Sequence, residues 1–105
     1  MILSSSNAAI SLSAGPQVWD RLWRHAPDER KDAARIERER RGRRWEATRE
    51  FLVRAFGRIE GLETVELGSG LGDVSVLLAE MGARVTLVDF CDRALHEARQ
   101  RFARL

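Results

Sequence analysis

The sequence of 105 residues has a single cysteine and contains no long hydrophobic run. Cys91 therefore has no partner for an internal disulfide, which is consistent with the reducing cytoplasm. No apolar run approaches the roughly 20 residues that cross a bilayer, so we expect no membrane span. Residues 1–15 are rich in Ser and Ala but lack the basic start of a secretory signal. We therefore predict a cytoplasmic protein with a flexible N-terminal arm over residues 1–15.

Histidine is also scarce, which limits the metal and nucleophile chemistry that the chain could support. His25 and His96 are the only histidines, and neither has a partner at metal-ligand spacing. The sequence offers no Ser-His-Asp arrangement, and no base or cation in the sequence marks Cys91 as a nucleophile. We predict no metal site, interpret Cys91 as a small packing residue, and leave the catalytic residues unknown.

The positive charge is almost entirely arginine, since Lys31 is the only lysine. The arginines are concentrated in residues 16–60, which are net positive, whereas residues 61–105 are net negative. An arginine-rich surface could meet an anionic partner such as nucleic acid. Acidic residues are interleaved with the arginines, however, as in residues 35–40, and spacings of three and four favour ion pairs within one helix. A solvated helix face is the favoured interpretation, and nucleic-acid binding is an open but unsupported alternative.

Residues 16–60 show the 3.6-residue periodicity of helices. A short helix is expected to end near Pro27, and Asp28 could cap a second helix that runs to Arg41 before a break at Gly42. A third helix is expected to end at Gly61, with Trp45, Leu52, Phe56 and Ile59 on one apolar stripe. We expect the tryptophans to pack these helices against a sheet.

After Gly61 the pattern becomes that of alternating strands and helices. We predict a strand over residues 62–67, a glycine turn over 68–72, a helix over 73–81, a strand over 83–88 and a final helix over 92–105 capped by Asp92. This order is a βαβ unit with a right-handed crossover. The predicted fold class is α/β: a Rossmann-like βαβ unit that begins at residue 61 and follows an arginine-rich helical segment over 16–60.

The strongest chemical signal is the strand that runs from Glu66 directly into a glycine turn, with Asp89 at the end of the next strand. Glycine lets the backbone bend sharply and approach a ligand without a Cβ. The carboxyl ends of neighbouring parallel strands lie at one rim of the sheet, where nucleotides bind in doubly wound folds. A carboxylate at that rim can accept hydrogen bonds from the hydroxyls of a ribose, so the combination is stronger evidence than the turn alone.

A dinucleotide-binding turn is the nearest competitor. Its fingerprint requires glycine at the place of Asp73, whose negative charge would face a pyrophosphate at the helix N-terminus. A ligand with ribose and adenine but no phosphate avoids this repulsion. A P-loop is excluded because no Gly-Lys-Ser/Thr follows the turn.

Residues 65–72, Val-Glu-Leu-Gly-Ser-Gly-Leu-Gly, resemble motif I of class I S-adenosylmethionine-dependent methyltransferases. Residues 78–89 resemble the stretch that follows motif I in that family. The resemblance implies that Gly68 and Gly70 pass along the methionine part of the cofactor and that Glu66 orients the loop and helps to hold the amino group. It further implies that Asp89 binds the ribose hydroxyls and that Phe90 lies against the adenine. The predicted cofactor-binding residues are Glu66, Gly68, Ser69, Gly70, Gly72, Asp89 and Phe90.

The resemblance covers only part of the family's domain. A class I sheet normally has seven strands, and only two are recognisable here, so we expect an N-terminal portion that is inactive alone. The missing C-terminal half, or an oligomer, would be needed to cover the sheet edges. The complete enzyme would transfer the sulfonium methyl directly to an acceptor that the sequence does not identify.

Blander interpretations stay open. Glu66 could pair with an arginine, and Asp89 could cap a turn. The whole chain could be a non-enzymatic, arginine-rich helical interaction module, or an NAD-type dinucleotide-binding domain, which Asp73 disfavours.

Overall fold

The computed structural model describes residues 2–4, 9–10 and 29–105. The short helix expected before Pro27, together with His25 and the first two tryptophans, lies outside the described residues. Within the described residues the order of elements is β1 (Ile2–Ser4), β2 (Ala9–Ile10), α2 (Glu29–Arg40), α3 (Arg43–Phe56), β3 (Glu63–Leu67), α4 (Asp73–Glu80), β4 (Arg84–Val88) and α5 (Asp92–Phe102).

Helices α2 and α3 are separated at Gly42, as the sequence predicts. Helix α2 carries acidic residues in its first turn and arginines in its last turn, which is the favourable arrangement for the helix dipole. The predicted end of α3 at Gly61 is wrong. The helix ends at Phe56, because Gly57 adopts a left-handed conformation (φ 79°) and donates its N–H to the Val53 carbonyl.

Strands β3 and β4 are parallel, with Glu63 opposite Arg84 and Leu67 opposite Val88, and α4 forms the crossover between them. This βαβ unit, preceded by helices, confirms the predicted α/β fold class. The expected Asp92 cap is wrong: Cys91 is the N-cap of α5 and makes no side-chain capping bond, and Asp92 is the first helical residue.

Part of the predicted N-terminal arm is a strand pair. Strand β1 pairs antiparallel with β4 on one side and β2 on the other, which gives the sheet order β2-β1-β4-β3. An unpaired edge of β4 would leave backbone N–H and C=O groups without partners, and β1 satisfies them. Strands of two and three residues carry too little alternation to be recognised in a sequence.

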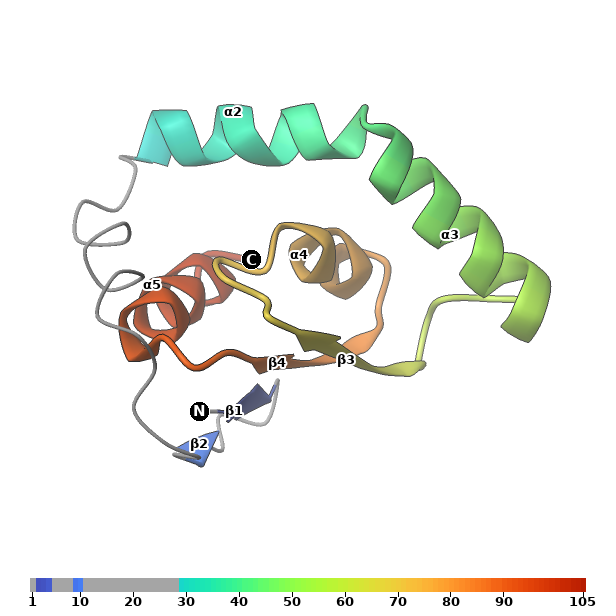
Figure 1. Cartoon of the computed structure of the whole chain (residues 1–105). Coiled ribbons are helices and arrows are strands. Elements are labelled where there is room, and N and C mark those ends of the chain that lie inside the picture. Colours follow the sequence, from blue (N-terminus) through green and yellow to red (C-terminus); the bar gives the residue numbers. More distant parts are fainter. Residues whose placement is uncertain (1, 5–8, 11–28) are drawn as a thin grey trace.

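The helices form layers above the sheet (Figure 1). Helices α4 and α5 cover one face of β3 and β4, and α2 and α3 lie farther out. The core between these layers contains Trp45 from α3, Leu77 from α4 and Val85 from β4, so the expected packing of Trp45 is confirmed. The apolar stripe expected on α3 extends too far, since Phe56 is exposed. None of the helices within the described residues is both long and apolar enough to span a membrane.

Candidate functional site

The glycine loop, residues 68–72, and Asp89 meet at the carboxyl ends of β3 and β4. Asp89 accepts a hydrogen bond from the Gly70 amide through Oδ2 (2.7 Å) and another from the Cys91 amide through Oδ1 (2.8 Å). The carboxylate at the end of β4 therefore fixes the middle of the loop that follows β3. A carboxylate can accept about four hydrogen bonds, so this arrangement is compatible with further donors such as ribose hydroxyls.

Three more amides of the loop also donate within the chain. Gly68 and Ser69 donate to the Val88 carbonyl (2.7 and 3.2 Å), and Gly72 donates to the Ser69 carbonyl (2.9 Å). Phosphate-binding turns depend on backbone N–H groups that point at the anion. Four of the five loop amides thus donate within the chain, which leaves few donors for a phosphate and makes the loop better suited to a ligand without one.

The loop glycines differ in what constrains them. Gly68 has φ +64° and open space where a Cβ would lie, so a ligand can approach its backbone closely. A Cβ on Gly72 (φ +70°) would instead lie 2.9 Å from Cδ1 of Leu87. A side chain at position 72 would thus crowd the core beneath the loop, whereas Gly68 borders open space.

Ser69 supplies a polar atom without a partner. Its side chain is buried, with 8% of the residue exposed, and Oγ has no hydrogen-bond partner among the described residues. Buried hydroxyls are normally hydrogen-bonded, so an orphaned one calls for an explanation. A ligand held in the loop would supply the missing partner, and the residues present therefore fit a small polar cofactor.

Glu66 lies on β3 directly before the loop and turns toward α4. The Ser75 hydroxyl donates to its Oε2 (2.6 Å). Burial raises the pKa of Glu66 above its ordinary value, and the hydrogen bonds from Ser75 and the charge of Arg44 offset this only in part. Within the described residues Glu66 has no salt bridge, because Arg44 pairs with Glu39 instead. Among the residues that the structure describes, no arginine therefore forms an ion pair with Glu66.

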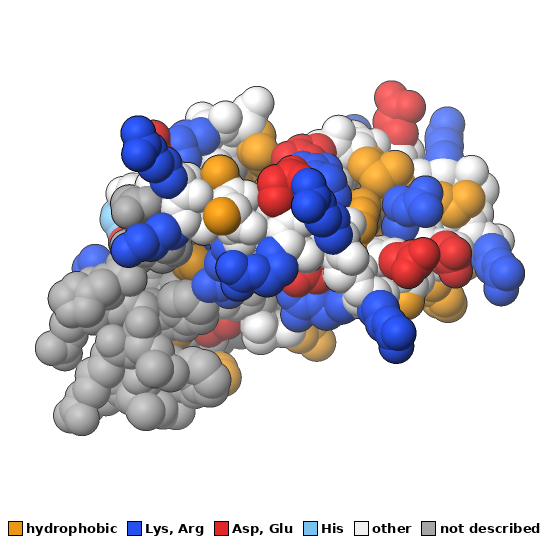
Figure 2. Space-filling model, turned by 90° about the horizontal axis from the view of Figure 1, so that it is seen from above, with side chains coloured by type: hydrophobic (Ala, Val, Ile, Leu, Met, Phe, Trp, Pro, Cys, Tyr) orange, Lys and Arg blue, Asp and Glu red, His pale blue; other side chains and the backbone are white. Residues whose placement is uncertain are grey.

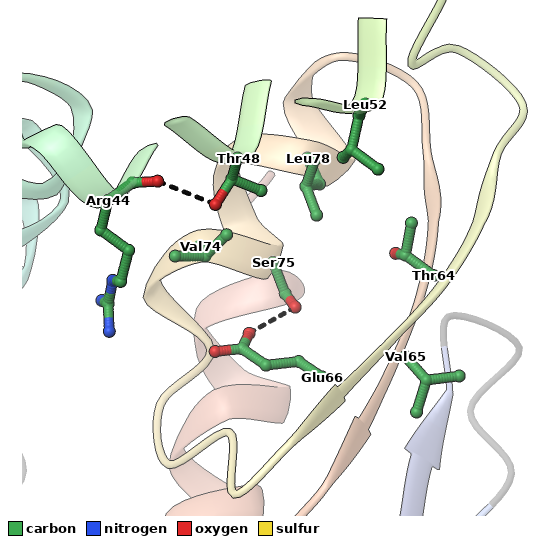
Figure 3. A pocket seen from close by; sticks show the side chains of 9 residues that line it. All are labelled: Arg44, Thr48, Leu52, Thr64, Val65, Glu66, Val74, Ser75 and Leu78. Atoms are coloured by element: carbon green, nitrogen blue, oxygen red, sulfur yellow. Dashed lines mark hydrogen bonds between the residues drawn. The ribbon is translucent and has the colours of Figure 1, made fainter. Parts of the chain in front are cut away.

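A pocket of about 330 Å³ borders Glu66 and Ser75 (Figure 3). It lies between α3, β3 and α4, and its wall combines apolar side chains from the two helices with the polar groups around Glu66. The lining residues are Arg44, Thr48, Leu52, Thr64, Val65, Glu66, Val74, Ser75 and Leu78. Glu66 is thus shared between the glycine loop that it precedes and this pocket.

The remaining predicted residues have simpler surroundings. Phe90 follows Asp89 and is 44% exposed, so its ring is accessible at the rim. Cys91 is buried, as expected for a packing residue. His96 is exposed and lies 3.0 Å from the Gln100 amide nitrogen. The described residues contain no group of His, Cys, Asp and Glu side chains that could hold a metal ion.

The structure also contains a site residue that the sequence did not reveal. Arg101 of α5 is only 4% exposed and donates to the Leu71 carbonyl within the glycine loop (2.9 Å). It also donates to Asp73 (2.6 Å) and to both carboxylate oxygens of Asp32. The one signal in the sequence is that Arg101 lies at helical spacing from the apolar residues Leu95 and Ala98.

Asp73 does not present an uncompensated negative charge at the start of α4, contrary to the expectation from the sequence. Its carboxylate is paired with both Arg101 and Arg35 (2.8 Å). Burial by itself would raise the pKa of Asp73, but the hydrogen bonds from the two arginines outweigh burial and lower it. Because this charge is compensated, it no longer argues against a phosphate, and the occupied loop amides carry that argument instead.

The outer surface over α2 and α3 shows arginines mixed with acidic and apolar side chains (Figure 2). Arg40 pairs with Glu37 within α2, as expected, but it also reaches Glu80 on α4. Arg44 of α3 pairs with Glu39 of α2. The ion pairs thus join different helices as well as residues of one helix. On the face shown in Figure 2, basic, acidic and apolar side chains are mixed.

Comparisons with models of protein families, with curated proteins and with solved structures give no significant match. The resemblance to class I methyltransferases therefore depends on the residues themselves and on the geometry of the loop.

Proposed function

We propose that this chain binds S-adenosylmethionine at the glycine loop and Asp89, as the donor-binding portion of a class I methyltransferase. The observation that supports this most directly is the 2.7 Å hydrogen bond from the Gly70 amide to Asp89. It makes the glycine loop and the carboxylate one unit at the rim of a parallel sheet, where nucleosides bind in such folds.

Each residue has a defined part in this proposal. Asp89 accepts hydrogen bonds from the ribose hydroxyls, and Phe90 lies against the adenine. The backbone at Gly68 and Gly70 runs along the methionine part, and Glu66 helps to hold its amino group. Ser69 contributes its unpartnered hydroxyl, and Gly72 keeps the loop packed on β4.

The cofactor, when bound, supplies a methyl group on a sulfonium, which is already a good leaving group. The task of these residues is therefore to position the donor, and positioning can account for a large part of a bimolecular rate enhancement. The methyl acceptor is not specified by any of them. The proposed site of action is the cytoplasm, consistent with the single buried thiol of Cys91.

An NAD-type dinucleotide is the alternative ligand at the same rim. It also contains adenosine, but its pyrophosphate requires backbone donors that this loop spends on Val88, Asp89 and Ser69. The proposal therefore predicts binding of S-adenosylhomocysteine without binding of NAD.

Calorimetry on the full chain tests the proposal with S-adenosylhomocysteine, NAD and a short RNA as separate titrants. We expect heat of binding with S-adenosylhomocysteine alone, and loss of binding in Asp89→Ala. Asp92→Ala is the matched control, because it removes an exposed carboxylate three residues away and should leave binding unchanged. The assignment would be overturned if the wild type did not bind S-adenosylhomocysteine or if Asp89→Ala still bound it. Binding of RNA instead would support the arginine-rich interaction module.

A further inference from the structure

The buried guanidinium of Arg101 contacts three separate parts of the chain. One nitrogen, Nη1, donates to the Leu71 carbonyl (2.9 Å) and to Asp73 Oδ1 (2.6 Å) at the start of α4. The other two nitrogens of the guanidinium, Nε and Nη2, donate to the carboxylate of Asp32 on α2. One side chain of α5 therefore joins the glycine loop, α4 and α2.

These contacts are of the kind that fix geometry. The guanidinium is planar and presents five N–H donors in a fixed fork, so its bidentate grip on Asp32 orients the group that holds Leu71. The carbonyl that it binds belongs to the loop itself, adjacent to Gly70 and Gly72. With Asp89 fixing the Gly70 amide from β4, the loop is held from two directions.

We propose that Arg101 is a positioning residue for the glycine loop and that Asp32 extends this support to helix α2. The inference rests on the proposed function, since it concerns the affinity of the same loop for its adenosine cofactor. Because binding and loop order are linked, an ordered α2 raises cofactor affinity, and a bound cofactor in turn stabilises the docking of α2.

Arg101→Lys separates positioning from simple charge compensation. A lysine keeps the positive charge beside the buried carboxylates, which protects the fold, but it has no planar fork to serve Asp32, Asp73 and Leu71 together. We expect Arg101→Lys to remain folded by circular dichroism and to bind S-adenosylhomocysteine about tenfold more weakly, the usual effect of losing a charge-assisted hydrogen bond.

Arg40→Lys is the matched control for this variant. Arg40 also ties α2 to α4, through Glu80 (2.8 Å), but it is exposed and its side chain bonds to Glu37 and Glu80 rather than to the loop. We expect Arg40→Lys to bind within about twofold of the wild type, since exposed ion pairs contribute little. Wild-type affinity in folded Arg101→Lys would show that Arg101 is only a counter-charge and would overturn the proposal.

A second pair of variants tests the part played by α2. Asp32→Asn weakens the grip on Arg101, whereas Glu80→Gln weakens the link between α2 and α4 at Arg40. We expect a severalfold loss of affinity for S-adenosylhomocysteine in Asp32→Asn and no change in Glu80→Gln. Equal affinities in the two variants would show that α2 does not support the glycine loop through Asp32.

Hydrogen exchange without cofactor distinguishes failure of this inference from failure of the proposed function. If the wild type does not bind S-adenosylhomocysteine, the donor-site assignment fails, yet the support of the loop can still be measured. We expect faster exchange of the Gly70 and Gly72 amides in Arg101→Lys than in Arg40→Lys. Equal exchange in the two variants would overturn the positioning role whether or not the cofactor binds.

Discussion

Two carboxylates that flank the glycine loop respond to opposite environments. Burial raises the pKa of Glu66, and its hydrogen bonds from Ser75 offset this only in part. Burial acts on Asp73 in the same way, but the hydrogen bonds from Arg101 and Arg35 outweigh it and lower the pKa. A buried carboxylate with a purely structural role is normally paired with a positive charge, as Asp73 is. A buried carboxylate with a raised pKa beside an open pocket is typical of a binding site.

Glu66→Gln tests this distinction at the level of one side chain. A folded pKa above the unfolded pKa means that stability is lost as pH rises through the folded pKa, because ionisation then costs more in the folded state. We expect Glu66→Gln to have a melting temperature at pH 8 equal to or about 2 °C above that of the wild type. The difference should disappear at pH 4, where Glu66 is protonated.

The control for this comparison is Glu46→Gln, at an exposed position of α3. It should show no such dependence on pH. Affinity for S-adenosylhomocysteine should fall in Glu66→Gln but not in Glu46→Gln. A clear loss of stability at pH 8 in Glu66→Gln would contradict the interpretation of Glu66 as a ligand-facing acid.

At the scale of elements, the turn between β3 and α4 depends on Gly72 for packing as well as for conformation. Its φ of +70° disfavours other residues, and a Cβ would also press on Leu87 and Phe102 from β4 and α5. Gly57 at the end of α3 has a similar φ (+79°), but a Cβ there would meet nothing within 4 Å. A substitution at Gly57 therefore tests backbone strain alone, whereas one at Gly72 tests backbone strain together with crowding.

We expect Gly57→Ala to lower the free energy of unfolding by about 1 kcal/mol, the cost of a left-handed conformation. Gly72→Ala should cost about 3 kcal/mol, because overpacking adds to the same strain. The midpoints and slopes of urea unfolding curves give the free energy of unfolding of each variant. Equal costs would mean that Leu87 and Phe102 adjust without penalty and that Gly72 is needed only for its φ.

The elements of the βαβ unit could be predicted from the sequence because their signals are local. The predicted strand over residues 62–67 and the observed β3 differ by one residue, and so do the predicted strand over 83–88 and β4. Apolar runs bounded by glycines are sufficient for such assignments. The early end of α3 does not follow from the sequence, because Gly57 and Gly61 are both suitable C-caps and both adopt a positive φ.

The support of the candidate site was beyond prediction for a different reason. Arg101 meets Asp73 across 28 positions of sequence and Asp32 across 69. Helical spacing suggests ion pairs within one helix, as for Arg40 and Glu37, but it contains no information about partners on other helices. The residues of the loop could be named from the sequence, whereas what holds the loop could not.

At the scale of the whole molecule, the ion pairs around Arg101 join helices α2, α4 and α5. Removing one partner leaves the other charges buried without compensation, which is costly. The folded pKa of Asp73 lies below its ordinary value of 3.8. Its contribution to stability is therefore present above that value and is lost as pH falls through the folded pKa.

We expect the melting temperature of the wild type to fall steeply as pH drops from about 5 toward 2. Asp73→Asn should melt about 5–10 °C lower at pH 7, through loss of charge-assisted hydrogen bonds, and should depend less on pH in the acid range. Asp92→Asn, at an exposed carboxylate, is the control and should match the wild type. Parallel acid profiles for Asp73→Asn and the wild type would exclude Asp73 as the titrating group.

The position of β3 has a consequence for colloidal behaviour. In the described part of the sheet β3 is an edge strand, and Val65 and Leu67 on it are 63% and 77% exposed. Such an edge is a template for aggregation, and natural sequences protect it with charged gatekeepers. Glu63 is the exposed charge at the start of this strand, and its 3.5 Å contact with Arg84 is too exposed to matter for stability.

We therefore expect Glu63→Val to aggregate, as measured by light scattering, at protein concentrations at which Glu46→Val stays clear. Glu46→Val is the same substitution at an exposed position of α3. Equal solubility of the two variants would show that the edge needs no such protection. If Glu63 does act as a gatekeeper, this one carboxylate keeps the edge strand from pairing with another molecule. Neutralising one glutamate would then change the chain from a dispersed protein into one that associates through β3.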